Sequence, residues 1–338
     1  MRRLAALLLL VALAPGTWLR MPPAPRSLEL DLRIVPLPLP PHAIARANLG
    51  PFELQQVWQL KSPHFSFGGY SALVPLGQGR MLAVSDLGWF LRFSVPGSPP
   101  GPQSLQPMFE EKIRLETDHD AESATRDPDS GDIWVATEGT NGVFRYDAGL
   151  RLQAFAHPPE IHGWDMNLGP EAMARLSDGR FVMLQEAFAG WNEERLHPAV
   201  IFSGDPTQSG RLEHFTFSGP ERFSPVDMAQ MPDGRVLVLM RRLVWPMPFR
   251  FAGKIALADP AEIRAGGIWH AREVARLSSQ LPIDNFEGIA LEPRSDGKVT
   301  VWLISDDNQA LSQRTLLWKM ALDPARLPPK AAPAKSGS

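Results

Sequence analysis

Carboxylates stand at both ends of one strand–turn–strand stretch of the sequence. Asp-Asn-Phe-Glu-Gly at residues 284–288 and Ser-Asp-Asp-Asn at residues 305–308 flank mostly apolar residues around an Asp-Gly turn. The strands of such a hairpin are antiparallel, so the start of the first and the end of the second lie at one edge. The pattern therefore predicts that Glu287 and Asp306 meet at one edge of a sheet.

The same arrangement occurs four times earlier in the chain. A polar or small start, a short apolar segment, a glycine-centred turn and a second apolar segment lead to Asp86, Glu138, Glu186 and Arg241, each seven residues after its turn glycine. The five turn glycines are spaced 52, 48, 55 and 63 residues apart: Gly79, Gly131, Gly179, Gly234 and Gly297. These spacings are typical of four-stranded propeller blades.

The repeats predict an all-β fold, a β-propeller of five four-stranded blades. Each repeat supplies two inner strands, and further β-type segments such as WFLRF from Trp89 follow them. Residues 53–60 precede the first repeat without a partner, so we expect them to close the ring as the outermost strand of the last blade. A six-bladed ring is the alternative, because the count rests on local propensities.

The two ends of the chain differ in composition from the repeats. Residues 1–19 have the form of a Sec-type signal peptide, with two arginines before a short apolar run. An uncleaved anchor is the weaker alternative, since a spanning helix needs roughly 20 apolar residues. Residues 20–51 are Pro-rich and predict an extended linker or surface wrap, and residues 323–338 predict a disordered tail. The expected domain is residues 52–322, in a protein exported to the periplasm or secreted.

Composition excludes several classes of function. The net charge of -3 leaves no basic face for nucleic acid. The absence of cysteine excludes disulfides and thiolate metal sites. Gly-x-Ser-x-Gly, phosphate-cradling glycine loops and Walker-type lysines are also missing, which argues against an α/β-hydrolase or a nucleotide-dependent enzyme.

Acids at the strand ends of different blades should converge near the axis of the ring. Such carboxylates repel one another unless a cation, an arginine or a proton compensates. A ring of hard oxygen ligands favours Ca²⁺ over softer metals. For any single acid, capping a turn or pairing with arginine is the alternative, but the recurrence in nearly every blade favours a site. The expected ring consists of Asp86, Glu122, Glu138, Glu171, Glu186, Asp227, Arg241, Glu287 and Asp306.

His119 is a further candidate because it lies beside Asp120 in the second repeat. Imidazole is a common general base, although an exposed loop histidine without a role is the alternative.

Several of these stretches resemble the phytase-like family, described as "esterase-like activity of phytase", a β-propeller domain of exported bacterial proteins. The resemblance covers about residues 53–322 and is most specific in the last repeat. It is carried by DAESATRDPDSGDIWVATEG, GPEAMARLSDGR, PVDMAQMPDGRVLVLMRR, NFEGIAL and LISDDNQALSQRTLLWKMAL.

This resemblance implies a hydrolase for a small-molecule ester or phosphoester, assisted by Ca²⁺ by analogy with propeller phytases. The metal ligands it implies are Glu122, Glu138, Glu171, Glu186, Asp227, Glu287 and Asp306. The catalytic candidates are Glu287, Glu122, Glu171 and His119, and the substrate-binding candidates are Arg241, Arg314 and Asn308.

The chain departs from the family at one point, and two other functions stay open. Related sequences often carry an acid just before the paired arginines, where this chain has Met240. A non-catalytic propeller that binds a ligand or a protein partner is one alternative. A lactonase-like propeller enzyme, which also uses a central divalent ion, is the other.

Overall fold

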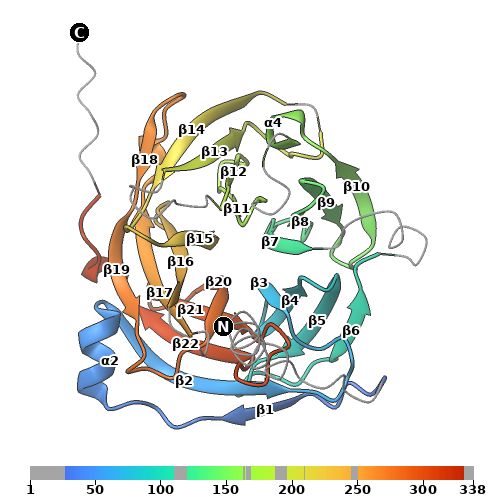
Figure 1. The fold of residues 1–338 in the computed structure, drawn as a ribbon, viewed down its shortest axis with the longest axis vertical. Helices are drawn as coiled ribbons and strands as arrows, with labels where there is room; N and C mark the ends of the chain where they lie inside the picture. The colour runs from blue at the N-terminus through green and yellow to red at the C-terminus, as the bar shows by residue number, and fades with distance from the viewer. Residues whose placement is uncertain are drawn as a thin grey trace, which may run out of the picture.

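Five β-sheets surround a common axis in the computed structural model of the chain (Figure 1). The structure describes residues 27–109, 120–162, 164, 169–186, 196–208, 210–244 and 250–330. The innermost strands of the five sheets are β3 (Tyr70–Gly77), β7 (Ala121–Arg126), β11 (Ala172–Arg175), β15 (Ser224–Gln230) and β20 (Asn285–Pro293). The predicted five-bladed propeller is therefore confirmed.

The first two blades are simple four-stranded meanders. Blade 1 continues from β3 through β4 (Arg80–Ser85), β5 (Trp89–Ser94) and β6 (Ser104–Pro107). Blade 2 continues from β7 through β8 (Ile133–Thr137), β9 (Gly142–Tyr146) and β10 (Leu152–Ala156). A short helix, α4 (Pro159–His162), follows blade 2.

Blades 3 and 4 share one stretch of chain. Blade 3 contains β11, β12 (Phe181–Leu184), β13 (Leu196–Phe202) and β14 (Leu212–Ser218), and blade 4 contains β15, β16 (Val236–Val244), β17 (Arg250–Ala258) and β19 (Arg272–Leu277). Between β17 and β19 the chain forms the 3-10 turn Pro260–Glu262 and returns to blade 3 as β18 (Ile268–His270), parallel to β14. No repeat or periodic pattern in the sequence predicts this three-residue strand.

The ring is closed within blade 5. This blade contains β20, β21 (Val299–Asp306) and β22 (Leu316–Leu322), and the N-terminal strand β2 (Phe52–Lys61) pairs with β22 as predicted. A fifth strand, β1 (Arg33–Pro36), pairs outside β2, so β2 is not the outermost strand. Joining strands from the two ends of the chain in one sheet removes the open edges of the ring.

The Pro-rich segment contributes ordered elements at its proline boundaries. Pro36 ends β1, and Pro41 precedes helix α2 (His42–Leu49), whose Ala45 and Leu49 are buried. These positions suit proline, because neither requires the missing backbone N–H inside a ladder. Similarly, the stretch predicted as a disordered tail begins with the 3-10 turn Pro324–Arg326, followed by the buried Leu327.

The hydrophobic core is divided among the contacts between neighbouring blades. Blades 1 and 2 share a cluster that includes Leu82 and Tyr146, and blades 4 and 5 share one that includes Leu239 and Trp318. Corresponding clusters lie between blades 2 and 3, 3 and 4, and 5 and 1. Because both faces of the inner strands are buried, β8 and β12 consist entirely of buried residues.

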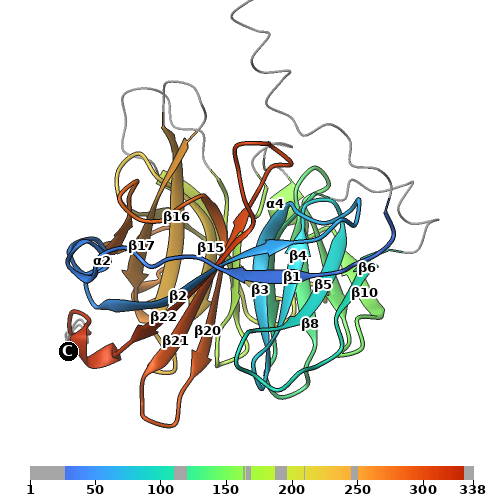
Figure 2. The same cartoon turned by 90° about the horizontal axis from the view of Figure 1, so that it is seen from below.

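The two ends of the ring differ in the segments that they expose. In Figure 2, the turn between β20 and β21 lies at the lower end and the loop that follows β21 lies at the upper end. The starts of the innermost strands and the ends of the second strands lie together at the upper end, because the strands are antiparallel. Among the described residues, no helix combines the length and apolarity needed to cross a bilayer.

Candidate functional site

Irregularities in the inner hairpins direct two of the predicted glutamates toward the axis. Glu122 is the extra residue of a bulge where β7 pairs with β8, and Glu287 holds the same place where β20 pairs with β21. A β-bulge leaves one residue unpaired and changes the direction of its side chain. The bulge therefore allows an acid at the start of a buried strand to leave the sheet.

The register of the hairpins defines three equivalent positions in every blade, which we call the rim positions. In blades 1, 2, 4 and 5 the second position is the extra residue at the register shift, the first is the residue two before it, and the third is the residue opposite the first. Blade 3 has no register shift, and its three positions are assigned by their spacing from Ala172 and from the turn glycine Gly179. Eight rim positions carry carboxylates and one carries arginine. In blade order the residues are Gly69, Ser71 and Asp86; Asp120, Glu122 and Glu138; Gly169, Glu171 and Glu186; Ser224, Val226 and Arg241; and Asn285, Glu287 and Asp306.

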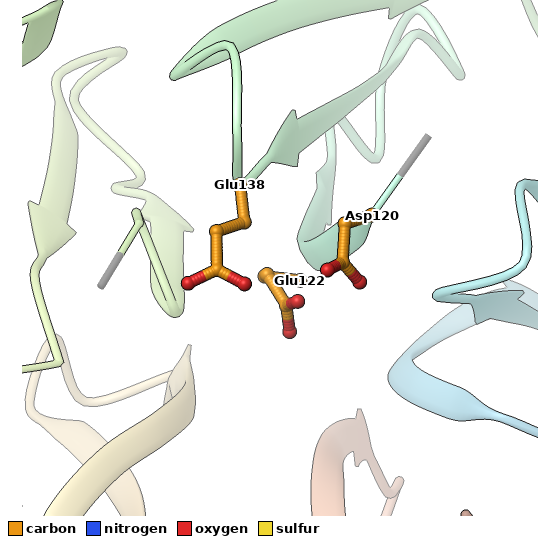
Figure 3. A group of neighbouring side chains, drawn as sticks. All are labelled: Asp120, Glu122 and Glu138. Atoms are coloured by element: carbon orange, nitrogen blue, oxygen red, sulfur yellow. The ribbon is translucent and has the colours of Figure 1, made fainter. Parts of the chain in front are cut away.

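Blade 2 contributes acids at all three of its rim positions. One oxygen from each of Asp120, Glu122 and Glu138 lies within 4.8 Å of the others, and their carboxylates approach one another in Figure 3. Two oxygens bound to one Ca²⁺ lie at most about 5 Å apart, because each Ca²⁺–oxygen distance is 2.3–2.6 Å. The three side chains could therefore hold one cation with little movement.

The pKa values of Glu122 and Glu138 show how unfavourable their negative charge is without a cation. Burial raises the pKa of Glu122 well above its usual range, and the charges of Glu171 and Asp120 raise it further. Burial and Asp120 raise the pKa of Glu138 to about 7, although the backbone N–H of Gly169 opposes the shift. A bound cation or a proton would relieve the same repulsion.

The neighbouring blades extend this acidic environment. Burial and Glu186 raise the pKa of Glu171 well above its usual range. Burial, Glu287 and Asp120 raise the pKa of Asp86 to about 7. The pKa of Asp306 is also well above its usual range because of burial, Glu287 and Asp86. Carboxylates from four blades thus influence one another around the axis, as the repeat pattern predicted.

Close packing at blade 1 requires glycine at its first rim position. Gly69 has a φ of +65°, and a Cβ at this residue would lie 1.9 Å from Oδ1 of Asp86. A side chain here would therefore push Asp86 from its place in addition to straining the backbone.

Arg241 is the cationic member of the rim. Its Nη1 donates hydrogen bonds to Glu287 and to Oδ1 of Asn285, the latter at 3.1 Å. The Nδ2 group of Asn285 also donates to Glu287, at 2.6 Å. Burial alone would lower the pKa of Arg241, but Glu287 and the other rim glutamates raise it above its ordinary value. Glu287 is therefore partly neutralised by a neighbour from blade 4.

Asp227 lies one residue beyond the bulge position and outside the rim. Its Oδ1 accepts the N–H of Met228 at 2.8 Å, and its Oδ2 accepts the N–H of Ile289 at 2.7 Å. Both carboxylate oxygens therefore join β15 to β20 of the next blade. These hydrogen bonds give Asp227 a structural contact between blades, and the cation contact expected from the sequence stays a prediction.

Asn308 and Arg314 both lie in the loop between β21 and β22. The Nε of Arg314 donates to Oδ2 of Asp284 at 3.4 Å, and burial raises the pKa of Asp284 to about 6 although Arg314 opposes this shift. Asn308 donates its N–H to Asp306 at 2.7 Å and its Nδ2 group to Gln313 at 2.6 Å. Both residues hold this loop in place beside the rim.

The site predicted from the sequence differs from the observed one at Asp120 and is left untested at His119. His119 lies outside the described residues, so its position relative to the triad stays a prediction. Asp120 was not among the predicted ligands. Its signal was nevertheless present, because Asp120 precedes Glu122 by two residues as Asn285 precedes Glu287.

Comparison with known proteins shows that most of the propeller matches the model of one protein family. The phytase-like family, described as "Esterase-like activity of phytase", matches residues 66–309. No curated protein matches the chain.

Solved structures resemble the chain at low sequence identity. The crystal structure of Myxococcus xanthus glutaminyl cyclase is 13% identical, with a TM-score of 0.45, over 80% of this chain and 97% of that chain. A luciferin-regenerating enzyme is 10% identical, with a TM-score of 0.41, over 78% and 83% of the two chains. The nidogen/laminin complex contains a chain that is 8% identical, with a TM-score of 0.41, over 78% and 95%.

Proposed function

Because the chain belongs to the phytase-like family, we propose that it is an exported hydrolase that acts on a phosphoester or another ester at the acidic rim. A divalent cation, Ca²⁺ in our proposal, is held by Asp120, Glu122 and Glu138. The observation that carries the proposal is the convergence of these three carboxylates, with oxygens within 4.8 Å of one another.

The donor set fits a hard cation. All three ligands are carboxylates, which Ca²⁺ prefers and which softer metals do not require. Arg241 is the single cationic side chain at the rim positions, against eight carboxylates. Burial, and after it the charges of the neighbouring acids, raise the pKa values of Glu122 and Glu138.

A bound cation would supply Lewis acidity, lower the pKa of a bound water and shield the charge of substrate phosphate. Among the residues of the chain, Glu171 can hold or accept a proton at neutral pH, because burial and Glu186 raise its pKa. Glu287 is oriented by Arg241 and Asn285. Nη2 and Nε of Arg241 make no hydrogen bond with the described residues and are suited to phosphate oxygens.

Assays of purified protein test this proposal. A generic phosphate monoester and a generic carboxylate ester would be offered with Ca²⁺ and, separately, with a chelator. We expect turnover of one ester class that the chelator abolishes. Glu122→Gln keeps the shape of the side chain but removes a ligand charge, so it should lower kcat/KM by about 100-fold, within the range for loss of one electrostatic contact.

Glu262→Gln provides the matched control, because Glu262 is exposed in the 3-10 turn between β17 and β18. It should leave both turnover and cation binding unchanged. Turnover that resists the chelator and survives Glu122→Gln would refute the cation-assisted mechanism. Cation-dependent stabilisation without turnover of any ester would instead identify a non-catalytic binding rim. Export itself is tested by whether the protein lacking residues 1–19 stays in the cytoplasm of an expressing bacterium.

A further inference from the structure

Three arginines meet between blades 1 and 2, away from the rim. Arg80 begins β4, Arg92 lies in β5, and Arg126 ends β7. They line one cleft of about 170 Å³. Leu76, Met81 and Phe93 contribute an apolar part of its wall.

The positive charge of this cleft is only partly compensated locally, because burial lowers the pKa of Arg92 and of Arg126 and the charges of Asp147 and Asp127 oppose this only in part. No carboxylate of the described residues lines it, and none of its three arginines forms a salt bridge within the described part of the chain. Two nearby acids are already paired with other cations. Oδ2 of Asp127 lies 3.1 Å from Arg175, and Oδ2 of Asp147 lies 2.9 Å from Nε of Arg151.

Arg92 carries an unused donor inside this environment. Its Nη2 donates to the carbonyl oxygen of Ala148 at 2.8 Å, whereas its Nε is buried without a hydrogen-bond partner. Leaving a buried donor unpaired is costly, and more so when the donor belongs to a charged group. Burial and the charge of Arg80 lower the pKa of Arg92, so the arginine charges are mutually unfavourable. An anion would satisfy the donor and the charge together.

We propose that this cleft binds a phosphate-type oxyanion, either inorganic phosphate or the phosphate group of a small phosphoester, through Arg80, Arg92 and Arg126. Guanidinium groups match the oxygens of phosphate with paired, directed N–H donors. The volume corresponds to about five or six waters at about 30 Å³ each, enough for one tetrahedral oxyanion with some remaining water. The apolar wall leaves room for a small organic substituent.

This anion site is separate from the acidic rim. Arg80 and Asp86 stand at opposite ends of β4, six residues apart, which corresponds to about 20 Å along an extended strand. The rim is strongly acidic, and without a cation it repels phosphate. Measurements in the presence of a chelator therefore report on the arginine cleft alone, whatever the outcome for the proposed hydrolase.

Calorimetric titration with inorganic phosphate at constant ionic strength, in the presence of a chelator, tests the site. We expect one phosphate to bind per chain and thermal unfolding to shift upward with phosphate concentration. Arg92→Gln and Arg126→Gln should each weaken binding at least tenfold. Arg272→Gln is the matched control, since Arg272 is exposed on the outer strand β19, and it should bind as the unaltered protein does.

A further variant tests whether weakened phosphate binding results only from misfolding. Arg92→Lys retains one positive charge but loses the Nε donor and the planar fork, so a folded Arg92→Lys protein with weakened binding supports the proposal. Binding that is unchanged in all three cleft variants would overturn it, as would an equal thermal shift from chloride at the same ionic strength.

Comparison of inorganic phosphate with phenylphosphonate distinguishes the two sources of the oxyanion. Tighter binding of phenylphosphonate, lost in Arg92→Gln, supports a small phosphoester whose substituent packs beside Phe93. Tighter binding of inorganic phosphate, with the same dependence on Arg92, supports free phosphate. Failure of both to bind would overturn the proposal.

Discussion

Blades 2 and 4 present different chemistry from the same three backbone positions. Blade 2 carries Asp120, Glu122 and Glu138, whereas the equivalent residues of blade 4 are Ser224, Val226 and Arg241. The inner hairpins of both blades contain a register shift at the same point. The fold therefore fixes where the rim side chains stand, and the sequence of each blade decides which charge is placed there.

The arrangement of these charges has a consequence for blade 5. Arg241 of blade 4 reaches Glu287 and Asn285, so this part of the rim contains its own cation. No basic side chain of the described residues forms a salt bridge with the triad of blade 2, and Arg241 acts on Glu122 only through its charge. The rim thus contains one acidic group that an arginine compensates and one that requires a proton or a cation from solution.

Removing the arginine gives the largest effect that we predict for this comparison. In Arg241→Met, Glu287 loses its charged partner in a site where its side chain is only 9% exposed. Because an unpaired buried charge is costly, we expect the cation-free protein to lose about 3 kcal/mol of unfolding free energy. Chemical denaturation in the presence of a chelator measures this loss.

The next residue supplies the control for this variant. Arg242 is exposed, and its guanidinium lies over the ring of Phe223. Arg242→Met should therefore change stability by well under 1 kcal/mol. Calcium should stabilise Arg241→Met more than the unaltered protein, because more negative charge is left uncompensated. Equal stability of Arg241→Met and the unaltered protein in the chelator would mean that Arg241 does not compensate the rim.

Changing the pH tests the rim carboxylates that form no salt bridge with an arginine. The folded-state pKa values of Asp86 and Glu138 are both raised to about 7, above the ordinary values near 4. Between pH 4 and 7 the folded protein therefore binds more protons than the unfolded chain, and its stability falls as pH rises. Over the two pH units from 5 to 7, Asp86 alone accounts for about 2.7 kcal/mol at 1.36 kcal/mol per unit. We therefore expect the cation-free protein to lose about 3 kcal/mol between pH 5 and 8, with only a small further part from Glu138, whose partial exposure screens its charge.

Thermal unfolding followed by circular dichroism, with a chelator at each pH, measures this trend. Added Ca²⁺ should raise the unfolding temperature more at pH 8 than at pH 5, since protons no longer occupy the carboxylates. An unfolding temperature that rises from pH 5 to 8 in the chelator would contradict the raised pKa values.

Much of the fold, but less of the site, could be predicted from sequence. The spacing of the turn glycines predicted the blades, and the unpartnered residues 53–60 predicted the closure. Strands β1 and β18 were missed because each has only three or four residues and depends on the edge of another sheet element: β1 on β2 beyond helix α2, and β18 on β14 of the preceding blade. Short segments of this kind lack a periodic pattern of their own.

Bulges explain why the sequence placed Asp227 with the rim acids. Asp227 and Glu122 occupy similar places in their repeats, but Val226 is the residue equivalent to Glu122. A shift of one residue moves a side chain to the other face of a strand. The repeat pattern showed that acids gather at the strand starts, but it did not show on which side of the bulge each one lies.

The smallest predicted effect distinguishes Asp227 from Glu122. Asp227→Asn should lower stability and keep Ca²⁺ affinity, whereas Glu122→Gln should lower Ca²⁺ affinity and keep stability. Both oxygens of Asp227 accept backbone N–H groups, whereas in Asp227→Asn one oxygen is replaced by an amide nitrogen that faces a donor. Burial raises the pKa of Asp227 well above its usual range, so loss of its charge offsets part of the cost of the lost hydrogen bond.

For Asp227→Asn we therefore expect a net loss of about 1 kcal/mol of unfolding free energy, as for one hydrogen bond, with Ca²⁺ affinity unchanged. Asp259→Asn is the control, because asparagine keeps an oxygen that can accept the N–H of Ala261 in this turn. Glu122→Gln should show the opposite result, with weakened Ca²⁺ binding and retained stability, because neutralising Glu122 reduces the repulsion in the triad. If Asp227→Asn instead weakened Ca²⁺ binding as much as Glu122→Gln, Asp227 would be a ligand and the distinction between the two positions would be wrong.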